Sequence, residues 1–262
     1  MSEVERLRTQ LKRLRLHTMA NIFEEEANKA ARAAVSYTAF LAHLSDEELA
    51  AKVDRSIQAR IGKARLPALR TLDEFDFGFQ PALSAGRVRE LAELGFLERA
   101  ENVLFVGRPG VGKTHLAIAL AFKACQERKR VLFVQALDLL EQLLAAQVTR
   151  SLGKFLESLG RLDLLVIDEL GYTPMDAQQA NLLFQLINHL YTRVALIVTT
   201  NVSFDAWGKL LGGDDMIASA ILDRLLHHSH VFLIAGPSYR MRGRLEGPMS
   251  LAGKPELGQD TA

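Results

Sequence analysis

The 262-residue chain is short of several features that would point to a secreted or membrane protein. Its one cysteine, Cys125, cannot form a disulfide within the chain, so we expect a reducing, cytoplasmic location. No run of about 18 apolar residues is present, which argues against a transmembrane helix. The charged N-terminus lacks the apolar segment of a signal peptide, and we expect none. The net charge is +1, so overall charge does not indicate nucleic-acid binding.

The first 66 residues carry helical patterns and no strand pattern, which predicts a small all-helical N-terminal domain. One stripe recurs at helical spacing through Val4, Leu7, Leu11, Leu14 and Thr18. A second helical pattern runs from about 37 to 65 and stops before Pro67. Residues 1–70 hold 13 Lys and Arg against 9 Asp and Glu. Positive side chains suit the phosphates of DNA, and the candidate contacts are Arg55, Arg60, Lys63 and Arg65.

A connector over residues 67–80 follows. Thr71 to Glu74 matches a capping box, and Phe75, Phe77 and Phe79 alternate behind it. Three exposed phenylalanines would be unfavourable, so we expect them to dock on the next domain.

Five apolar runs separated by helical patterns then predict a parallel β-sheet covered by helices on both faces, an α/β fold. The runs cover residues 103–106, 131–134, 164–167, 195–198 and 231–234. After Tyr239 the chain is rich in Gly, Pro and Arg, which predicts a flexible tail.

A phosphate-binding loop lies between the first run and the helical pattern behind it. Residues 107–114 match the pattern G-x-x-x-x-G-K-[ST]. Glycines let the backbone N–H groups turn toward phosphates, and the following helix N-terminus adds positive potential. Lys113 is expected to reach the β- and γ-phosphates of ATP and Thr114 to ligate Mg²⁺. The nucleotide-binding residues are predicted to be Gly107, Arg108, Pro109, Gly110, Val111, Gly112, Lys113, Thr114 and His115.

Two carboxylates end the third apolar run. Asp168 and Glu169 come at the carboxyl edge of the sheet, where open α/β sheets bind ligands. We expect Asp168 to hold Mg²⁺ and Glu169 to act as the general base on the attacking water. An Asp-Glu pair after a strand is weak evidence alone, and the upstream phosphate loop strengthens it.

Three other positions have a functional and a structural interpretation. Asn201 ends the fourth run and can contact the γ-phosphate or the water, or form a turn. Arg224 follows a helical pattern and is equally consistent with an arginine finger and with a solvated surface residue. The histidines at 227, 228 and 230 lack the spacing of a zinc site and are interpreted as structural.

Together these motifs closely resemble the IstB family, the helper ATPases of insertion sequences. The matching segments are 107–117, 165–172, 183–185, 200–201, 221–228 and 238–240, with 66–67 and 71–77 in the connector.

The resemblance implies an AAA+ three-layer α/β module, close to DnaC-type helicase loaders, without a C-terminal lid. It implies Asn201 as first sensor, Arg224 as arginine finger and Arg240 as second sensor. It also implies homo-oligomers that bind duplex DNA with ATP and Mg²⁺ and assist a cognate transposase. The expected organisation is a helical DNA-binding domain (1–66), a connector (67–80), the ATPase domain (81–242) and a tail (243–262).

Two alternatives stay open. A DnaC-like replicative helicase loader would share the ATPase core but would need a helicase-docking surface on its N-terminal domain. A small-molecule kinase would need a substrate pocket and a lid that the sequence does not supply. The basic segment 55–70 and the pair His227–His228 favour the transposition helper. A transposase gene adjacent to the gene for this chain would distinguish the helper from the helicase loader.

Overall fold

A five-stranded parallel sheet forms the centre of the computed structural model, which describes residues 1–241. The strands are ordered β2-β3-β4-β1-β5 across the sheet. Their bounds are β1 Asn102–Gly107, β2 Val131–Gln135, β3 Leu164–Leu170, β4 Ala195–Thr200 and β5 Ser229–Ile234. All five predicted strands are confirmed, each longer by one to three residues than the apolar run that predicted it. The tail predicted over residues 243–262 lies outside the described residues.

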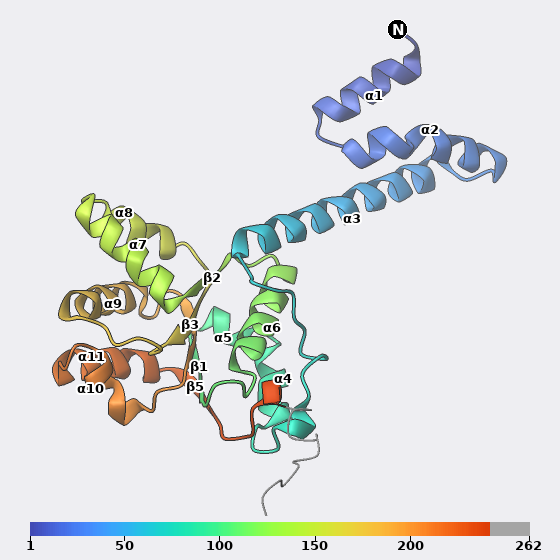
Figure 1. Ribbon diagram of the computed structural model, residues 1–262. Coiled ribbons are helices and arrows are strands. Elements are labelled where there is room, and N and C mark those ends of the chain that lie inside the picture. Colours follow the sequence, from blue (N-terminus) through green and yellow to red (C-terminus); the bar gives the residue numbers. More distant parts are fainter. Residues whose placement is uncertain (242–262) are drawn as a thin grey trace, which may run out of the picture.

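Helices cover both faces of the sheet, so the predicted three-layer α/β architecture is confirmed (Figure 1). One face carries α7 Ala136–Val148, α8 Leu152–Leu159, α9 Ala177–Leu190, α10 Trp207–Leu210 and α11 Asp215–Leu226. The other carries α4 Ala85–Leu91, α5 Gly95–Glu98 and α6 Lys113–Gln126. Strand β1 shows why both faces are buried, because its side chains alternate. Leu104 and Val106 enter the core of the first face, while Val103 and Phe105 enter the core of the second.

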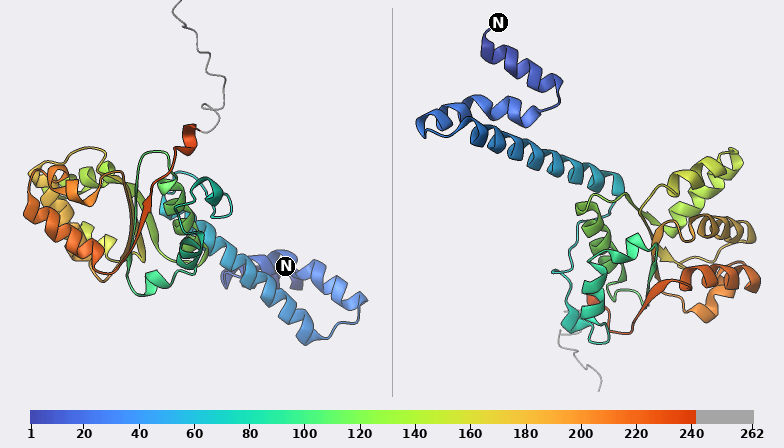
Figure 2. Two further views of the ribbon diagram at one scale, coloured as in Figure 1. Left: turned by 90° about the horizontal axis from the view of Figure 1, so that it is seen from below. Right: turned by 180° about the vertical axis from the view of Figure 1, so that it is seen from behind.

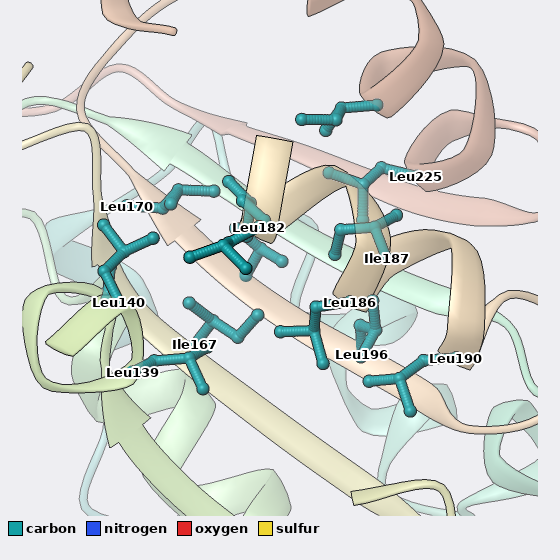
Figure 3. Packing of buried hydrophobic residues seen from close by; sticks show 14 of the residues in the cluster. Leu139, Leu140, Ile167, Leu170, Leu182, Leu186, Ile187, Leu190, Leu196 and Leu225 are labelled. Carbon is teal, nitrogen blue, oxygen red and sulfur yellow. The ribbon is translucent and has the colours of Figure 1, made fainter. Parts of the chain in front are cut away.

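The core of the first face is built mainly from leucine and isoleucine side chains. Figure 3 shows Ile167 and Leu170 of β3 beside Leu182 and Leu186 of α9. All four side chains are at most 1% exposed. Burying such a side chain contributes about 1.5–3 kcal/mol, so this layer fixes the strand ends that carry the polar residues.

Three helices form the predicted N-terminal region: α1 Glu3–Arg13, α2 His17–Arg32 and α3 Tyr37–Ala64. Their core is small and centres on Met19, Phe23 and Leu44. Two further views show these helices projecting away from the sheet (Figure 2). The far end of α3 packs against α6 and β2, and Ala64 is buried in the core of the second face. Helix α3 therefore connects the helical region to the layer that contains the phosphate loop.

The first helical stripe is interrupted where the sequence pattern continued to Thr18. Helix α1 ends at Arg13, because Arg15 adopts a left-handed conformation with φ 58°. The Leu16 N–H then donates to the Leu11 carbonyl at 2.9 Å, a Schellman closure. Glycine is the usual residue at that position, so an arginine there gave no stop signal.

The connector docks on the second face, as predicted. Leu72, Phe75 and Phe77 pack against its core, and the 3₁₀-helix η1 spans Phe77–Phe79. Half of the predicted capping box forms, since the Thr71 N–H donates to Glu74 Oε2 at 3.1 Å. An α-helix does not follow it; the chain makes a turn and then η1. The contact predicted for the box therefore forms within a turn of the connector.

The described chain ends in the short 3₁₀-helix η3, Tyr239–Met241, and η2, Phe204–Ala206, precedes α10. Within residues 1–241 no helical lid follows β5, in agreement with the expectation. No helix of this part combines the length and the apolar character needed to cross a bilayer.

Candidate functional site

The phosphate loop connects the end of β1 to the start of α6, as its sequence pattern requires. All three of its glycines, at 107, 110 and 112, are in conformations or contacts that exclude other residues. Gly112 has φ 101°, and a Cβ there would lie 2.6 Å from the Phe75 ring. A Cβ on Gly107 would lie 2.3 Å from the Ile234 carbonyl oxygen of the neighbouring strand. The loop is therefore held between the connector on one side and β5 on the other.

Lys113, the first residue of α6, points back into this loop. Its Nζ donates to the carbonyl oxygens of Gly107 at 2.7 Å and Arg108 at 2.9 Å. Burial lowers the pKa of the Lys113 ammonium below its ordinary value, while the Asp168 and Glu169 carboxylates raise it and Arg240 lowers it. The ammonium is thus partly desolvated and close to another cation. An anion bound in the loop would stabilise its charged form.

Thr114 and Asp168 meet directly, although they are 54 residues apart in sequence. The Thr114 hydroxyl donates to the Asp168 carboxylate, with distances of 3.0 and 3.1 Å to its two oxygens. Asp168 is 3% exposed and also accepts a hydrogen bond from the Thr199 hydroxyl. A hydroxyl and a carboxylate oxygen are ligands that Mg²⁺ prefers. The two predicted metal ligands therefore fit the ion at this point.

Glu169 is presented by an irregularity in β3. The pairing of β3 with β4 shifts between Ile167 and Leu170, and Glu169 adopts φ 59°, in the left-handed region. Its N–H donates to Thr199 Oγ1 at 2.9 Å. The side chain is exposed at the cleft. A left-handed glutamate is strained, and this strain turns the carboxylate away from the sheet and toward the ligand space.

A single cleft of about 1160 Å³ brings most of the predicted site residues together. Lys113, Thr114, Glu169, Asn201 and Arg240 all line it. Seven of the nine predicted loop residues, 109 to 115, line it as well. Gly107 and Arg108 instead supply the carbonyls that hold Lys113.

Arg240 reaches the cleft because the segment after β5 is attached to the loop. The Tyr239 N–H donates to the Gly110 carbonyl at 2.8 Å. A Cβ on Gly110 would collide with the Ser238 side chain, which shows how closely the segments approach. This contact places the expected second sensor at the cleft without a lid domain.

The apolar side chains that line the cleft outside the loop were not predicted to be part of the site. They include Phe75 and Phe79 of the connector, Ile118 and Tyr239. Phe79 and Tyr239 stack edge to face with centroids 5.2 Å apart. Apolar and aromatic side chains in the same cleft as a phosphate loop suit the base of a nucleotide. The alternating phenylalanines of the connector were the available signal, and in the sequence they were interpreted as packing alone.

His115 and Gln80 fix the connector to the rest of the cleft. His115 Nε2 lies 2.9 Å from the Thr71 carbonyl oxygen, and its ring is 5.4 Å from that of Phe75. Gln80 is 2% exposed and donates through Nε2 to the Pro237 carbonyl at 3.0 Å. Both contacts join segments that only the fold brings together.

Arg224 lies at the opposite edge of the sheet from the cleft. Asn102, the first residue of β1, donates through Nδ2 to the Leu225 carbonyl at 3.0 Å and lies 3.4 Å from that of Arg224. The phosphate loop begins at the other end of β1, about 17 Å away at 3.3 Å per residue. Among the described residues, none that lines the cleft comes from α11. Arg224 therefore does not contribute to the cleft of its own chain.

The candidate DNA contacts are in different environments. Arg55 is paired with Glu48 at 2.9 Å. Burial raises the pKa of Glu48, but hydrogen bonds from the Met19 and Thr18 N–H groups and from Arg55 outweigh it, and the pKa lies below its ordinary value. Lys63 and Arg65 are exposed, and Arg60 is half-buried. Arg55 thus has a structural partner, whereas Lys63 and Arg65 are exposed and belong to none of the ion pairs within residues 1–241.

Two of the three histidines after α11 have side-chain hydrogen-bond partners. His227 Nδ1 lies 2.6 Å from the Tyr191 hydroxyl, and His230 Nε2 lies 2.9 Å from Glu101 Oε2. The part of the chain that the structure describes has no cluster of three or more potential metal-binding His, Cys, Asp or Glu residues. Both observations agree with the structural interpretation.

Comparison with known proteins identifies relatives over almost the whole chain. Residues 9–247 match the family model described as IstB-like ATP binding protein. The chain is 42% identical over 242 residues to an ATP-binding protein of insertion sequence IS21 from Pseudomonas aeruginosa, covering 92% of this chain and 90% of the relative. It is 42% identical to that of IS5376 from Geobacillus stearothermophilus, covering 91% and 94%.

Solved structures support the fold. AMPPCP-bound DnaA from Aquifex aeolicus superposes with a TM-score of 0.54 at 22% identity, covering 65% of this chain and 51% of that one. DnaI superposes with a TM-score of 0.51 at 18% identity, covering 63% and 90%. The sheet and loop are therefore those of the AAA+ fold, and with its phosphate loop, carboxylate pair and near full-length relatives the chain belongs to the IstB-like ATP-binding proteins of insertion sequences.

Proposed function

We propose that this chain is an ATPase that assembles on duplex DNA and assists the transposase of its insertion sequence. The observation that carries the ATPase part is the convergence of Lys113, Thr114, Glu169, Asn201 and Arg240 on one cleft. The relatives are ATP-binding proteins of insertion sequences, which favours a transposition helper over a helicase loader. Likeness to the replication proteins extends to the fold alone.

Each polar group of the cleft has a task that follows from its position. Lys113 and the loop N–H groups hold the phosphates. Thr114 and Asp168 would hold Mg²⁺, which would neutralise part of the negative charge of the phosphates. Glu169, turned into the cleft by its bulge, takes a proton from the attacking water. Asn201 and Arg240 contact the γ-phosphate from β4 and from the segment after β5.

The remaining transition-state charge is stabilised from a second copy of the chain. The backbone of Arg224 lies at the amino end of β1, whereas the phosphate loop begins at its carboxyl end. None of the described residues that line the cleft comes from α11, so Arg224 acts on a nucleotide held by a neighbour. ATP then lies between copies, and hydrolysis weakens the contact between them.

DNA binding follows from the assembly rather than from net charge, which is +1. Lys63 and Arg65 lie where α3 meets the ATPase core, and their repetition in neighbouring copies would multiply the phosphate contacts of the assembly. Such binding has little sequence preference and weakens steeply with salt.

The test is sedimentation or size-exclusion chromatography of the full chain with duplex DNA and either ATP or no nucleotide. We expect the wild type to assemble on DNA with ATP, Lys113→Ala to fail, and Glu169→Gln to remain assembled because it holds ATP without hydrolysing it. Equal loading of duplex DNA by single copies without nucleotide would refute the proposal. Normal hydrolysis by Glu169→Gln would refute the role of the base.

A further inference from the structure

Arg224 is held by two side chains of the neighbouring helix α9. Its Nε donates to Asn188 Oδ1 at 3.0 Å, and its guanidinium carbon lies 5.0 Å from the centroid of the Phe184 ring. Phe184 and Asn188 are four residues apart, so they lie one above the other on the same face of α9. A third contact, from Arg224 Nη1 to the Ala220 carbonyl at 2.8 Å, comes from its own helix.

These partners are all uncharged. Within residues 1–241 none of the ion pairs includes Arg224. A surface arginine with a purely structural role commonly pairs with a carboxylate. Here an amide oxygen, a ring face and a carbonyl fix the guanidinium while its full positive charge stays available.

The geometry also leaves donors available. An arginine has five N–H donors in a planar fork, and the contacts to Asn188 and Ala220 use two of them. The other donors can bind phosphate oxygens. Fixing a long side chain in advance lowers the entropy lost when it binds.

We propose that Phe184 and Asn188 are positioning residues that preform Arg224 as an arginine finger for the nucleotide of a neighbouring copy. This inference rests on the proposed function, in which Arg224 acts between copies. The two residues touch neither the nucleotide of their own chain nor its cleft; they act through Arg224.

The test mixes two inactive variants of the full chain and measures ATP turnover. Arg224→Ala holds ATP but offers no finger, and Lys113→Ala offers a finger but holds no ATP. Their mixture should regain turnover at the mixed interfaces. The Lys113→Ala partner is then made again with Phe184→Leu or with Asn188→Ala, so that the second change lies only in the copy that donates the finger.

We expect either second change to lower the regained kcat about tenfold, since a cation–π contact or a single hydrogen bond is worth roughly that factor. KM for ATP should stay the same, because the cleft belongs to the other copy. Phe184→Tyr retains the ring face and should restore turnover. Gln185→Ala, on the same helix but bonded to Asn181, should have no effect.

Three outcomes would overturn the inference. Undiminished turnover with both Phe184→Leu and Asn188→Ala would show that Arg224 needs no support. A rise in turnover would show that the contacts hold the arginine back instead of presenting it. Failure of the original mixture would remove the finger itself and refute the proposed function, which separates this result from the other two. Thermal unfolding of each variant checks its fold, and because the two positions are independent, one misfolded variant leaves the other as the test.

Discussion

Thr199 connects the buried Asp168 to Glu169, which lines the cleft, and is itself fully buried, at 0% exposed. Its hydroxyl donates to Asp168 and accepts the N–H of Glu169 at 2.9 Å. Thr199→Val keeps the shape of the side chain and removes the hydroxyl. The substitution therefore deprives a buried carboxylate of a donor and leaves the N–H of the strained Glu169 without its acceptor.

The expected loss of stability can be worked from these two contacts. A hydrogen bond to a charged group is worth about 1.5–3 kcal/mol, and an unsatisfied buried N–H costs about 1–3 kcal/mol. The two effects share one hydroxyl and do not add fully, so we expect about 3 kcal/mol. For a domain of this size the melting temperature should then fall by about 6–12 °C.

The functional loss should exceed what the change in stability explains. Glu169 would no longer be held in its bulge, so turnover should fall well below wild type at a temperature where Thr199→Val is still folded, while ATP binding stays close to normal. Calorimetric unfolding, nucleotide titration and an ATPase assay measure the three quantities. Thr199→Ser, which keeps the hydroxyl, is the matched control. A Thr199→Val protein that melts and hydrolyses ATP like wild type would refute the reasoning.

Two further predictions concern glycines and pH. Gly112→Ala should destabilise the protein and weaken nucleotide binding, because its Cβ would meet the Phe75 ring at 2.6 Å and its φ is unfavourable for alanine. Gly153→Ala, where nothing lies within 4 Å of the added Cβ, should stabilise helix α8 by about 0.5–1 kcal/mol in chemical denaturation. A Gly112→Ala protein more stable than wild type and a Gly153→Ala protein less stable would contradict both predictions. Arg99 lowers the pKa of Glu101 to about 2 from 4.5. The stabilisation by this contact is present above pH 4.5 and is lost as the pH falls toward 2, so Arg99→Ala should lower the melting temperature at pH 6 and have little effect near pH 2.

The elements of the ATPase core could be predicted because each has a strong local signal. Apolar runs bounded by helical patterns gave all five strands, and the loop pattern gave the position of α6. Asp168 and Glu169 could be placed at the cleft because the carboxyl ends of parallel strands share one edge. Such signals depend on residue spacing, which can be read directly from the sequence.

The missed parts of the site depend on contacts between distant segments. Thr199 was an ordinary strand residue in the sequence, and its role comes from the pairing of β4 with β3. Tyr239 and the connector phenylalanines reach the cleft because β5 and η1 end beside the loop. The β-bulge that turns Glu169 has no local marker, since the left-handed residue is a glutamate rather than a glycine.

By itself, the sequence determined which residues bind phosphate, which edge of the sheet carries them and which family the chain resembles, because these properties follow from residue type and spacing along one strand–loop–helix unit. The tertiary structure decided how the carboxylates are held, how Arg240 reaches the loop without a lid, and that Arg224 lies at the far edge of the sheet. Those outcomes depend on which strands are neighbours and where each helix ends, and neither is encoded within any one segment.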